Sequence, residues 1–205
     1  MKGIKDVAIL YRENGFSPVP LRAGKKSPKL KGWQRLCDAP LTIEEINTSF
    51  GPNDGIGLAM GFDGMQCLDI DAKHFESGEE YEEFITLLNE RDPEIIKKVV
   101  IKHTPSGGKH WLFKCDAIGK NQKLSRASSG EVIFETREQG GQAVVWPTAG
   151  YRIEGKITNI QRLSVEERRV LFHCAKMMDK MPEPAKPTPR ALMGGSGEYD
   201  TDTPW

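Results

Sequence analysis

The 205-residue sequence contains no run of about 20 apolar residues, the length that a membrane-spanning helix requires. Its first residues also lack the apolar run of a secretory signal peptide. We therefore expect a cytoplasmic protein with no membrane partner. Hydrophobic residues make up 38% of the chain and charged residues 28%, a composition that is typical of a globular domain.

Cysteine is scarce, and none of the four cysteines belongs to a CxxC or CxxH pair. The four are far apart in the sequence, at Cys37, Cys67, Cys115 and Cys174. This spacing suggests neither a zinc ribbon nor a disulfide framework. We expect free thiols and no zinc.

The sequence also lacks net charge, because 29 Lys and Arg residues balance 29 Asp and Glu residues. The charges are nevertheless distributed unevenly. Residues 1–36 carry nine basic and two acidic side chains, and residues 97–126 carry eight and one, so each region has a net charge of +7. Such regions favour a polyanionic partner, and a solvated basic surface is the alternative.

Hydrophobic periodicity and capping motifs predict helices and strands in alternation. Helical spacing covers residues 4–13, and an N-cap hydroxyl with Glu three residues later begins helices near 43–50, 78–90 and 165–180. Apolar runs predict strands at 56–60, 65–70, 99–104, 110–114, 131–136 and 142–148. Glycine-rich turns predict hairpin joins at 61–64, 105–108 and 139–141. The pattern indicates an α+β fold with a mostly antiparallel sheet.

The composition changes after Lys180, where residues 181–205 become rich in Pro and Gly and then acidic. Such a segment has no core of its own and is typical of a linker. We expect one folded domain at residues 1–180 and a linker at 181–205 that leads to a further region of a longer protein. A docking peptide that ends in Trp205 is the alternative.

Three carboxylates are predicted to lie on strands. Asp69 and Asp71 share one face of their strand, because side chains alternate with a period of two. Holding two like charges together is unfavourable unless a cation lies between them or one carboxylate is protonated. Glu135 adds a third carboxylate beside Arg137, although a cross-strand salt bridge is the alternative there. Such a cluster suits Mg²⁺ or Mn²⁺ in a two-metal site for phosphoryl transfer.

The segment TPSGGKH joins two predicted strands through a glycine pair. Gly107 and Gly108 allow the backbone to approach a ligand closely and to present N–H groups to an anion. The same turn carries a hydroxyl, a cation and an imidazole, those of Ser106, Lys109 and His110. The segment is a candidate triphosphate cradle, and a plain hairpin turn is the alternative.

The order of these motifs resembles that of the bifunctional primase-polymerases in the archaeo-eukaryotic primase superfamily. The resemblance covers residues 4–178 and rests on GKKSPKLKGW (24–33), LDID (68–71), TPSGGKH (104–110) and FETREQGGQAVVWPT (134–148). It implies a primase fold, in which an RRM-like, mostly antiparallel catalytic sheet joins an N-terminal α/β unit. It also implies a phage or plasmid replication protein with a linked helicase region.

The resemblance implies a role for each matching residue. The two divalent ions would be held by Asp69, Asp71 and Glu135, and His110 would complete the catalytic centre. The incoming nucleotide would contact Ser106, Gly107, Gly108, Lys109, His110 and Arg137. Glu135 departs from the family pattern, which usually has Asp at this position, so the metal geometry there differs by one methylene.

The implied activity is template-directed transfer of a dNTP or NTP to a 3′-hydroxyl, with single-stranded DNA template and primer as partners. Template phosphates would contact Lys25, Lys26, Lys29 and Lys31. A metal-dependent nuclease is one alternative, although a triphosphate cradle serves a polymerase and is unnecessary for hydrolysis. A non-catalytic, replication-associated DNA-binding module is another, and it would bind DNA without metal-dependent nucleotide binding.

Overall fold

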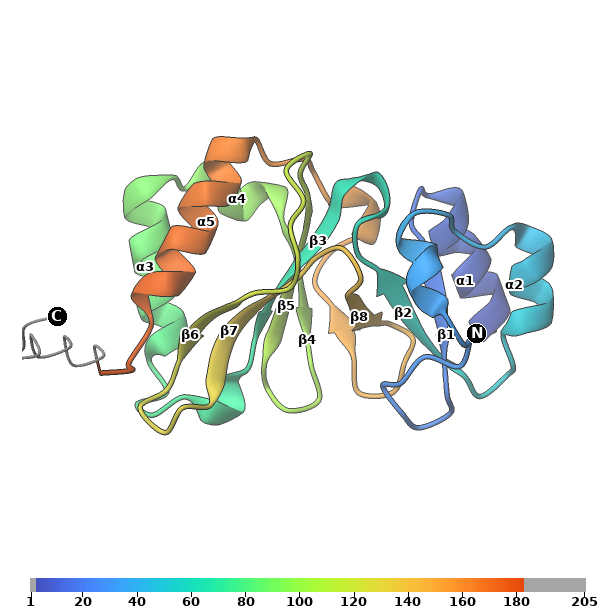
Figure 1. Ribbon diagram of the computed structural model, residues 1–205, viewed down its shortest axis with the longest axis horizontal. Helices are drawn as coiled ribbons and strands as arrows, with labels where there is room; N and C mark the ends of the chain where they lie inside the picture. The colour runs from blue at the N-terminus through green and yellow to red at the C-terminus, as the bar shows by residue number, and fades with distance from the viewer. Residues whose placement is uncertain (1–2, 183–205) are drawn as a thin grey trace, which may run out of the picture.

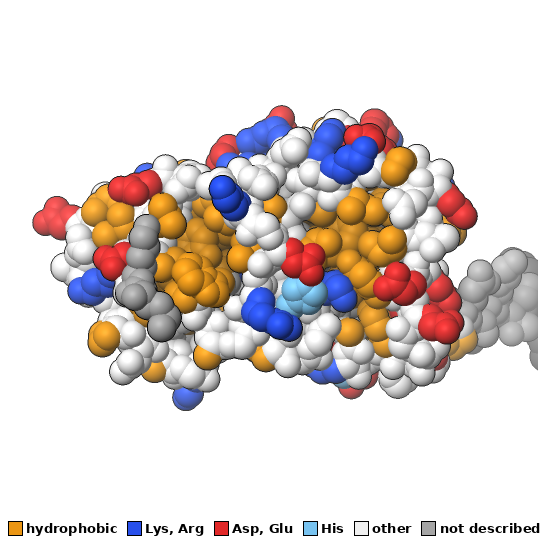
Figure 2. All heavy atoms as spheres, turned by 180° about the vertical axis from the view of Figure 1, so that it is seen from behind, with side chains coloured by type: hydrophobic (Ala, Val, Ile, Leu, Met, Phe, Trp, Pro, Cys, Tyr) orange, Lys and Arg blue, Asp and Glu red, His pale blue; other side chains and the backbone are white. Residues whose placement is uncertain are grey.

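The computed structural model describes residues 3–182, which form two sheets that lie side by side along the long axis of the molecule (Figure 1). Every pairing between the labelled strands is antiparallel, and helices accompany both sheets. Seen from behind, two hydrophobic areas flank a histidine with basic side chains around it (Figure 2). The predicted α+β class is confirmed.

The smaller sheet has the strand order β1-β2-β8 and lies beside two helices (Figure 1). Its elements are β1 (Pro18–Leu21), β2 (Gly55–Ala59), β8 (Gln142–Val145), α1 (Ile4–Glu13) and α2 (Ile43–Ser49). α1 buries Val7, Ala8 and Tyr11, which share one face because of their helical spacing. These side chains join strand residues such as Ile56 and Leu58 in one hydrophobic core.

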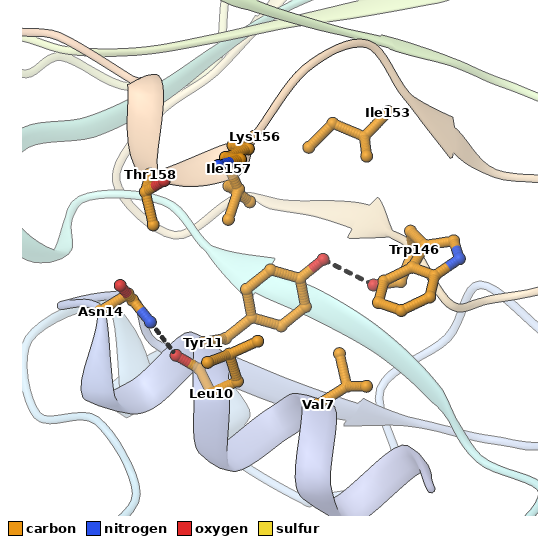
Figure 3. Close-up of a pocket in the computed structure, with 9 residues that line it drawn as sticks. All are labelled: Val7, Leu10, Tyr11, Asn14, Trp146, Ile153, Lys156, Ile157 and Thr158. Carbon is orange, nitrogen blue, oxygen red and sulfur yellow. Dashed lines mark hydrogen bonds between the residues drawn. The ribbon is translucent and has the colours of Figure 1, made fainter. Parts of the chain in front are cut away.

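The contact between α1 and the segment after β8 is partly polar. The hydroxyl of Tyr11 donates a hydrogen bond to the carbonyl oxygen of Trp146 at 2.6 Å (Figure 3). Beside it lies an apolar pocket of about 370 Å³, whose lining includes Val7, Leu10, Trp146 and Ile153 (Figure 3). None of the predicted site residues lines this pocket.

The larger sheet has the strand order β6-β7-β3-β5-β4-β9. Its strands are β3 (Met65–Ile70), β4 (Val100–His103), β5 (Lys109–Lys114), β6 (Lys123–Arg126), β7 (Val132–Arg137) and β9 (Arg152–Ile153). One face packs against helices, which are α3 (Glu80–Arg91), α4 (Glu94–Lys98) and α5 (Val165–Met177). The core between them contains Leu68, Trp111 and Phe134 from the sheet and Phe84 and Leu171 from the helices.

The opposite face of the larger sheet carries the polar side chains. Alternation explains the division, because Leu68 and Ile70 point into the helix-covered core while Asp69 points to the other side. Asp69 lies opposite His110 on β5 and opposite Glu135 on β7, and facing residues in adjacent strands project to the same side. The fold therefore gathers these three side chains on one surface.

Short 3₁₀ helices complete the described chain, at Trp33–Cys37, Phe62–Gly64, Ala72–His74 and Ile157–Asn159. All four cysteines are buried and free, as expected. Within residues 3–182, no helix combines the length and the apolar character needed to span a membrane. The predicted linker lies outside the described residues from residue 183 onward.

The predicted helices are present, with small differences at their ends. α3 begins at Glu80 rather than at residue 78, because the Ser77 hydroxyl accepts a hydrogen bond from the N–H of Glu79 and not, as a capping box requires, from that of Glu80. The Glu80 carboxylate accepts hydrogen bonds from the N–H groups of Glu76 and Ser77 before the helix. α5 ends at Met177 rather than at residue 180. The sequence patterns also missed α4, β6 and β9, which are short.

Two of the three predicted hairpins were wrong. The turn at 105–108 does connect hydrogen-bonded neighbours, β4 and β5. The turns at 61–64 and 139–141 instead connect strands of different sheets, because β2 pairs with β1 and β8 while β3 and β7 belong to the larger sheet. A glycine-rich turn reverses the chain but does not determine where the next strand pairs.

Candidate active site

The centre of the candidate site is Asp69, in the middle of the larger sheet. His110 approaches from β5, with its Nε2 atom 3.3 Å from Oδ1 of Asp69. Glu135 lies on the other side, directly across from Asp69 on β7. Three side chains with acid, base or ligand chemistry thus come from three adjacent strands.

Arg137 lies between the two carboxylates. Its Nη2 atom is 3.2 Å from Oδ2 of Asp69 and also donates a hydrogen bond to Oε1 of Glu135. Its Nε atom is 3.3 Å from the same oxygen of Asp69. The guanidinium therefore supplies the cation that allows two acids to lie close together.

The environment sets the charges of this cluster. Burial alone would raise the pKa of Asp69, but the hydrogen bond from His110 and the charge of Arg137 outweigh burial and lower the pKa to about 2. Burial raises the pKa of Glu135, and Arg137 offsets this effect only in part. Burial also lowers the pKa of His110, against the opposing effect of Asp69. Near neutral pH, Asp69 is therefore ionised and the imidazole of His110 is neutral.

Asp71 has different partners from those of Asp69. It follows the last residue of β3, and its carboxylate is 2.9 Å from Nζ of Lys73 and 3.9 Å from Nε2 of His74. Because β3 ends at Ile70, strict alternation no longer fixes the direction of the Asp71 side chain.

Carboxylate oxygens are the donors that Mg²⁺ and Mn²⁺ prefer, and Asp69 is ionised, so the donor chemistry fits a hard divalent cation. The arrangement of side chains is not a closed metal site. In the described part of the chain, no three His, Cys, Asp or Glu side chains form a group that could hold a metal ion. Arg137 instead bridges Asp69 and Glu135.

The turn between β4 and β5 packs tightly against the end of β3. Gly107 has a φ of 84°, and a Cβ atom at Gly108 would lie only 2.4 Å from the carbonyl oxygen of Ile70. The contact at Gly108 leaves no room for a side chain, and the positive φ at Gly107 favours glycine there. The hydroxyl of Ser106 is exposed and lies 3.1 Å from that of Thr104.

The structure separates Lys109 from its neighbour His110. Lys109 lies with its Nζ atom 3.9 Å from the ring centroid of Tyr81, in a cation–π contact. His110 lies on the opposite side of the strand, beside Asp69. A nucleotide contact by Lys109 stays a prediction, as does one by Ser106.

A pocket of about 350 Å³ opens beside Asp69. It is lined by Asp69, His110 and Arg137 from the larger sheet and, among others, by Lys26, Asn121, Gly140, Gly141 and Tyr151 from the surrounding segments. A second pocket of about 400 Å³ shares Lys26 and Tyr151 with the first and adds Lys25. Pockets of this size accommodate small-molecule ligands, and their basic side chains favour an anion.

The four predicted DNA-binding lysines are placed differently. Lys25 and Lys26 line the second pocket. Lys29 lies 2.9 Å from a carboxylate oxygen of Asp54, so its charge is already paired. Lys31 is exposed.

Sequence reasoning missed Lys102 and Tyr151. Lys102 is fully buried on β4, where burial lowers its pKa to about 8, and Tyr151 is 5% exposed and lines both pockets. The sequence held one signal for the burial of Lys102. Because strand side chains alternate, Lys102 faces the same side as Val100, two residues before it, and that side is buried. A strand lysine is ordinarily solvent-exposed, so the signal is weak.

Comparison with known proteins assigns the sequence to a family. The chain matches the family model described as bifunctional DNA primase/polymerase, N-terminal, over residues 8–163. The matched segment contains Asp69, His110, Glu135 and Arg137. No curated protein matched the chain. Since the family model covers well over half of the 205 residues, the predicted resemblance is confirmed, and the chain belongs to the bifunctional DNA primase/polymerase family.

Proposed function

We propose that this domain catalyses metal-dependent, template-directed transfer of a nucleotide from a dNTP or NTP to a 3′-hydroxyl during DNA replication. The observation that carries the proposal is the cluster of Asp69, His110, Glu135 and Arg137 on one sheet face, three of which line a basic pocket. Membership of the primase/polymerase family supports the same activity.

The chain's own groups suit a triphosphate. Arg137 offers a planar set of N–H donors that matches phosphate oxygens, and Lys26 adds a second cation at the pocket wall. His110 also lines the pocket, where its Nε2 atom lies 3.3 Å from Oδ1 of Asp69 and holds that carboxylate in place. Donors that are already in place cost little reorganisation when charge develops on the phosphoryl oxygens.

The residues that would hold Mg²⁺ or Mn²⁺ are Asp69, Asp71 and Glu135, in a two-metal site. When bound, such ions lower the pKa of the attacking hydroxyl and neutralise charge on the leaving group. Asp69 is ionised and ready to act as a ligand, whereas the raised pKa of Glu135 makes its ionisation more dependent on a nearby positive charge. Arg137 now supplies that charge.

Single-stranded template DNA would run past the second pocket, where Lys25 and Lys26 present their side chains. Affinity from such phosphate contacts falls steeply as the salt concentration rises. Lys29 would contribute less, because Asp54 already neutralises it. The linked helicase region, the cytoplasmic location and the phage or plasmid source stay predictions.

A non-catalytic nucleotide- or DNA-binding module is the second candidate. It is favoured by one observation, namely that Arg137 bridges Asp69 and Glu135 while Asp71 pairs with Lys73 and His74. In that case the cations of the protein itself, rather than divalent ions, would be the permanent partners of the acids.

The test incubates the protein with a primed single-stranded template and four dNTPs, in Mg²⁺ or in Mn²⁺, and follows primer length. Metal-dependent extension is the expected result. Metal-dependent shortening would favour a nuclease instead. If the primer length stays constant in both metals while the protein still binds the template, the binding module replaces the polymerase.

A further inference from the structure

The apolar pocket beside Tyr11 has no part in the proposed mechanism, yet an exposed tryptophan lines it (Figure 3). Trp146 is 44% exposed, although a residue of this type is highly buried on average. Leu10, at 39%, adds a second exposed apolar side chain to the same pocket. A contiguous exposed apolar surface is typical of an interaction site.

The position of Trp146 is fixed by its backbone rather than by burial of its ring. The Tyr11 hydroxyl donates a hydrogen bond to the Trp146 carbonyl oxygen at 2.6 Å, and the preceding residue, Val145, is fully buried at the end of β8. The indole therefore lies at a defined place on the pocket wall with part of its surface open to solvent. An aromatic ring that is already held in place accepts a second planar ring with little loss of conformational freedom.

The apolar pocket adjoins the second pocket, the one lined by Lys25. On one side, Trp146 lines the apolar pocket and the next residue, Pro147, lines the second pocket. On the other side, Ile4 lines the second pocket and Val7, about one turn further along α1, lines the apolar pocket. Because the same two segments of the chain border both pockets, a ligand chain can pass from one to the other.

The second pocket also adjoins the pocket beside Asp69. Lys26 and Tyr151 line both of these pockets. The three pockets therefore follow one another along the surface, from Asp69 past the lysines to Trp146.

The two outer pockets offer positive charge. Lys156 lines the apolar pocket, and Lys25 and Lys26 line the second. Among the described residues that line these two pockets, the one acidic side chain is that of Asp54, which Lys29 already neutralises. Cations for a chain of phosphates beside an aromatic face for a base are the combination that binds single-stranded nucleic acid.

We propose that single-stranded DNA extends from the pocket beside Asp69 along these pockets and stacks one base on the ring of Trp146. The binding of a single strand follows from the pockets themselves, whereas its role as the template rests on the proposed function. A pocket of about 370 Å³ is at the small end of the range for ligand pockets, so it suits one base with its sugar better than a protein helix. Stacking on an aromatic ring tolerates any base sequence, as a template-reading enzyme requires.

A protein segment that covers the same apolar surface is the alternative, and it makes a different prediction. A stacked base is lost when the DNA has no bases, whereas a protein contact does not depend on DNA at all. An abasic oligonucleotide separates the two, because it keeps the phosphates and removes the stacking partner.

The experiment measures binding by fluorescence anisotropy at several salt concentrations. Its two probes are an oligothymidylate of about 12 nucleotides, within the range of single-strand site sizes, and an abasic strand of the same length. Trp146→Ala should weaken binding of the oligothymidylate about tenfold, the scale of one lost stack between a base and an aromatic ring. It should leave the affinity for the abasic strand and the salt dependence unchanged.

Three further variants serve as controls. Trp146→Phe keeps an aromatic face and should retain most of the affinity. Lys156→Ala should weaken both strands and lower the slope of affinity against salt concentration by about one. Ile43→Ala removes a side chain that is also 39% exposed but lines none of the three pockets, and it should change neither affinity.

Unchanged oligothymidylate binding by Trp146→Ala would overturn the proposal, and so would an equal loss for both strands. The wild type gives a second readout that needs no variant, because ultraviolet irradiation with an oligonucleotide that carries 5-iodouracil should form a cross-link at Trp146. Cross-links only at residues outside the apolar pocket would also overturn the proposal. If the stacking results are as expected but no primer is extended, the proposed polymerase activity fails while the single-strand site stands. If primers are extended and Trp146→Ala binds both strands as the wild type does, the single-strand site fails alone.

Discussion

Nη2 of Arg137 lies 3.2 Å from Oδ2 of Asp69, which places a permanent positive charge against the central carboxylate of the larger sheet. The contact joins β7 to β3, and the same guanidinium also bonds Glu135. An arginine in this position lets acids that repel one another share one sheet face. It also leaves a cation beside the pocket, where a polyanionic ligand can use it.

Replacement of Arg137 tests this dual role. Arg137→Met should raise the pKa of Asp69, because one of the positive charges that lower it is removed. It should also reduce nucleotide incorporation about 100-fold, the usual scale for loss of one preorganised donor to developing charge. Steady-state primer extension measures the second effect. Arg162→Met, which removes an arginine that bonds Asp63 and Asp116 outside the pocket, should retain most of the activity, and equal losses in both variants would contradict the account.

The glycine pair after β4 offers two substitutions with different outcomes. In Gly108→Ala, the new Cβ would meet the backbone oxygen of Ile70 at 2.4 Å, so the turn must shift and stability should fall by about 1–3 kcal/mol. In Gly107→Ala, the new Cβ has no atom within 4 Å. The only cost is the backbone strain of a positive φ, so stability should fall by about 1–2 kcal/mol.

Urea unfolding measures these losses, and dATP titration measures their effect on the site. Because Gly108 packs against β3 next to Asp71, Gly108→Ala should weaken dATP binding more than Gly107→Ala does. Equal dATP affinities in the two variants would show that this turn does not form part of the nucleotide site.

Glu80 gives a pH-dependent stability effect away from the site. Burial alone would raise its pKa, but hydrogen bonds from the backbone N–H groups of Ser77 and Glu76 lower the pKa to about 2. A depressed pKa in the folded state stabilises the protein at pH values above the unfolded-state pKa, and this contribution is lost as the pH falls through the folded-state value.

Glu80→Gln should therefore destabilise the protein by about 1–2 kcal/mol near neutral pH. The difference from the wild type should shrink as the pH falls from about 4 towards 2. Urea unfolding across this range measures it, with the exposed Glu79→Gln as the control. A difference that stays constant down to the lowest pH would refute the ionised, hydrogen-bonded state of Glu80.

Two neighbouring lysines should differ in their effect on DNA binding. Lys26→Ala removes a cation that lines both pockets, whereas Lys29→Ala removes one that Asp54 already neutralises. Lys26→Ala should weaken binding of single-stranded DNA and lower the slope of affinity against salt concentration by about one, whereas Lys29→Ala should change both less. Fluorescence anisotropy at several salt concentrations makes the comparison. If Lys29→Ala weakened DNA binding more than Lys26→Ala, the DNA would not run past the pockets that Lys26 lines.

Much of the site was predictable because a strand has a simple period. The sequence placed Asp69, Glu135 and Arg137 on strands and His110 just after the glycine turn, and the structure brings these four together. Asp71 was predicted to share the face of Asp69; β3 ends one residue earlier and the Asp71 carboxylate pairs with Lys73, so its place in the cluster stays a prediction. Local periodicity does not predict the residue at which a strand ends.

Long-range pairing was not predictable from local patterns. The partner of β2 on one side is β8, more than 80 residues later, so no turn motif could reveal that the strands divide into two sheets. The burial of Lys102 depends on the same division, since its carbonyl partner belongs to the smaller sheet. Lys102 lies between Ile101 and His103, and nothing in this local sequence identifies its partner, the carbonyl oxygen of Val144 on β8.

The most direct test of the central claim is primer extension by Asp69→Ala/Asp71→Ala beside a matched double variant, Asp63→Ala/Asp116→Ala. The control also removes two acidic side chains, and both of them pair with Arg162 outside the pocket. The account predicts that the first variant loses metal-dependent synthesis while keeping most of its DNA affinity, and that the control retains both. Wild-type levels of extension by Asp69→Ala/Asp71→Ala would contradict the assignment of this cluster as the catalytic centre.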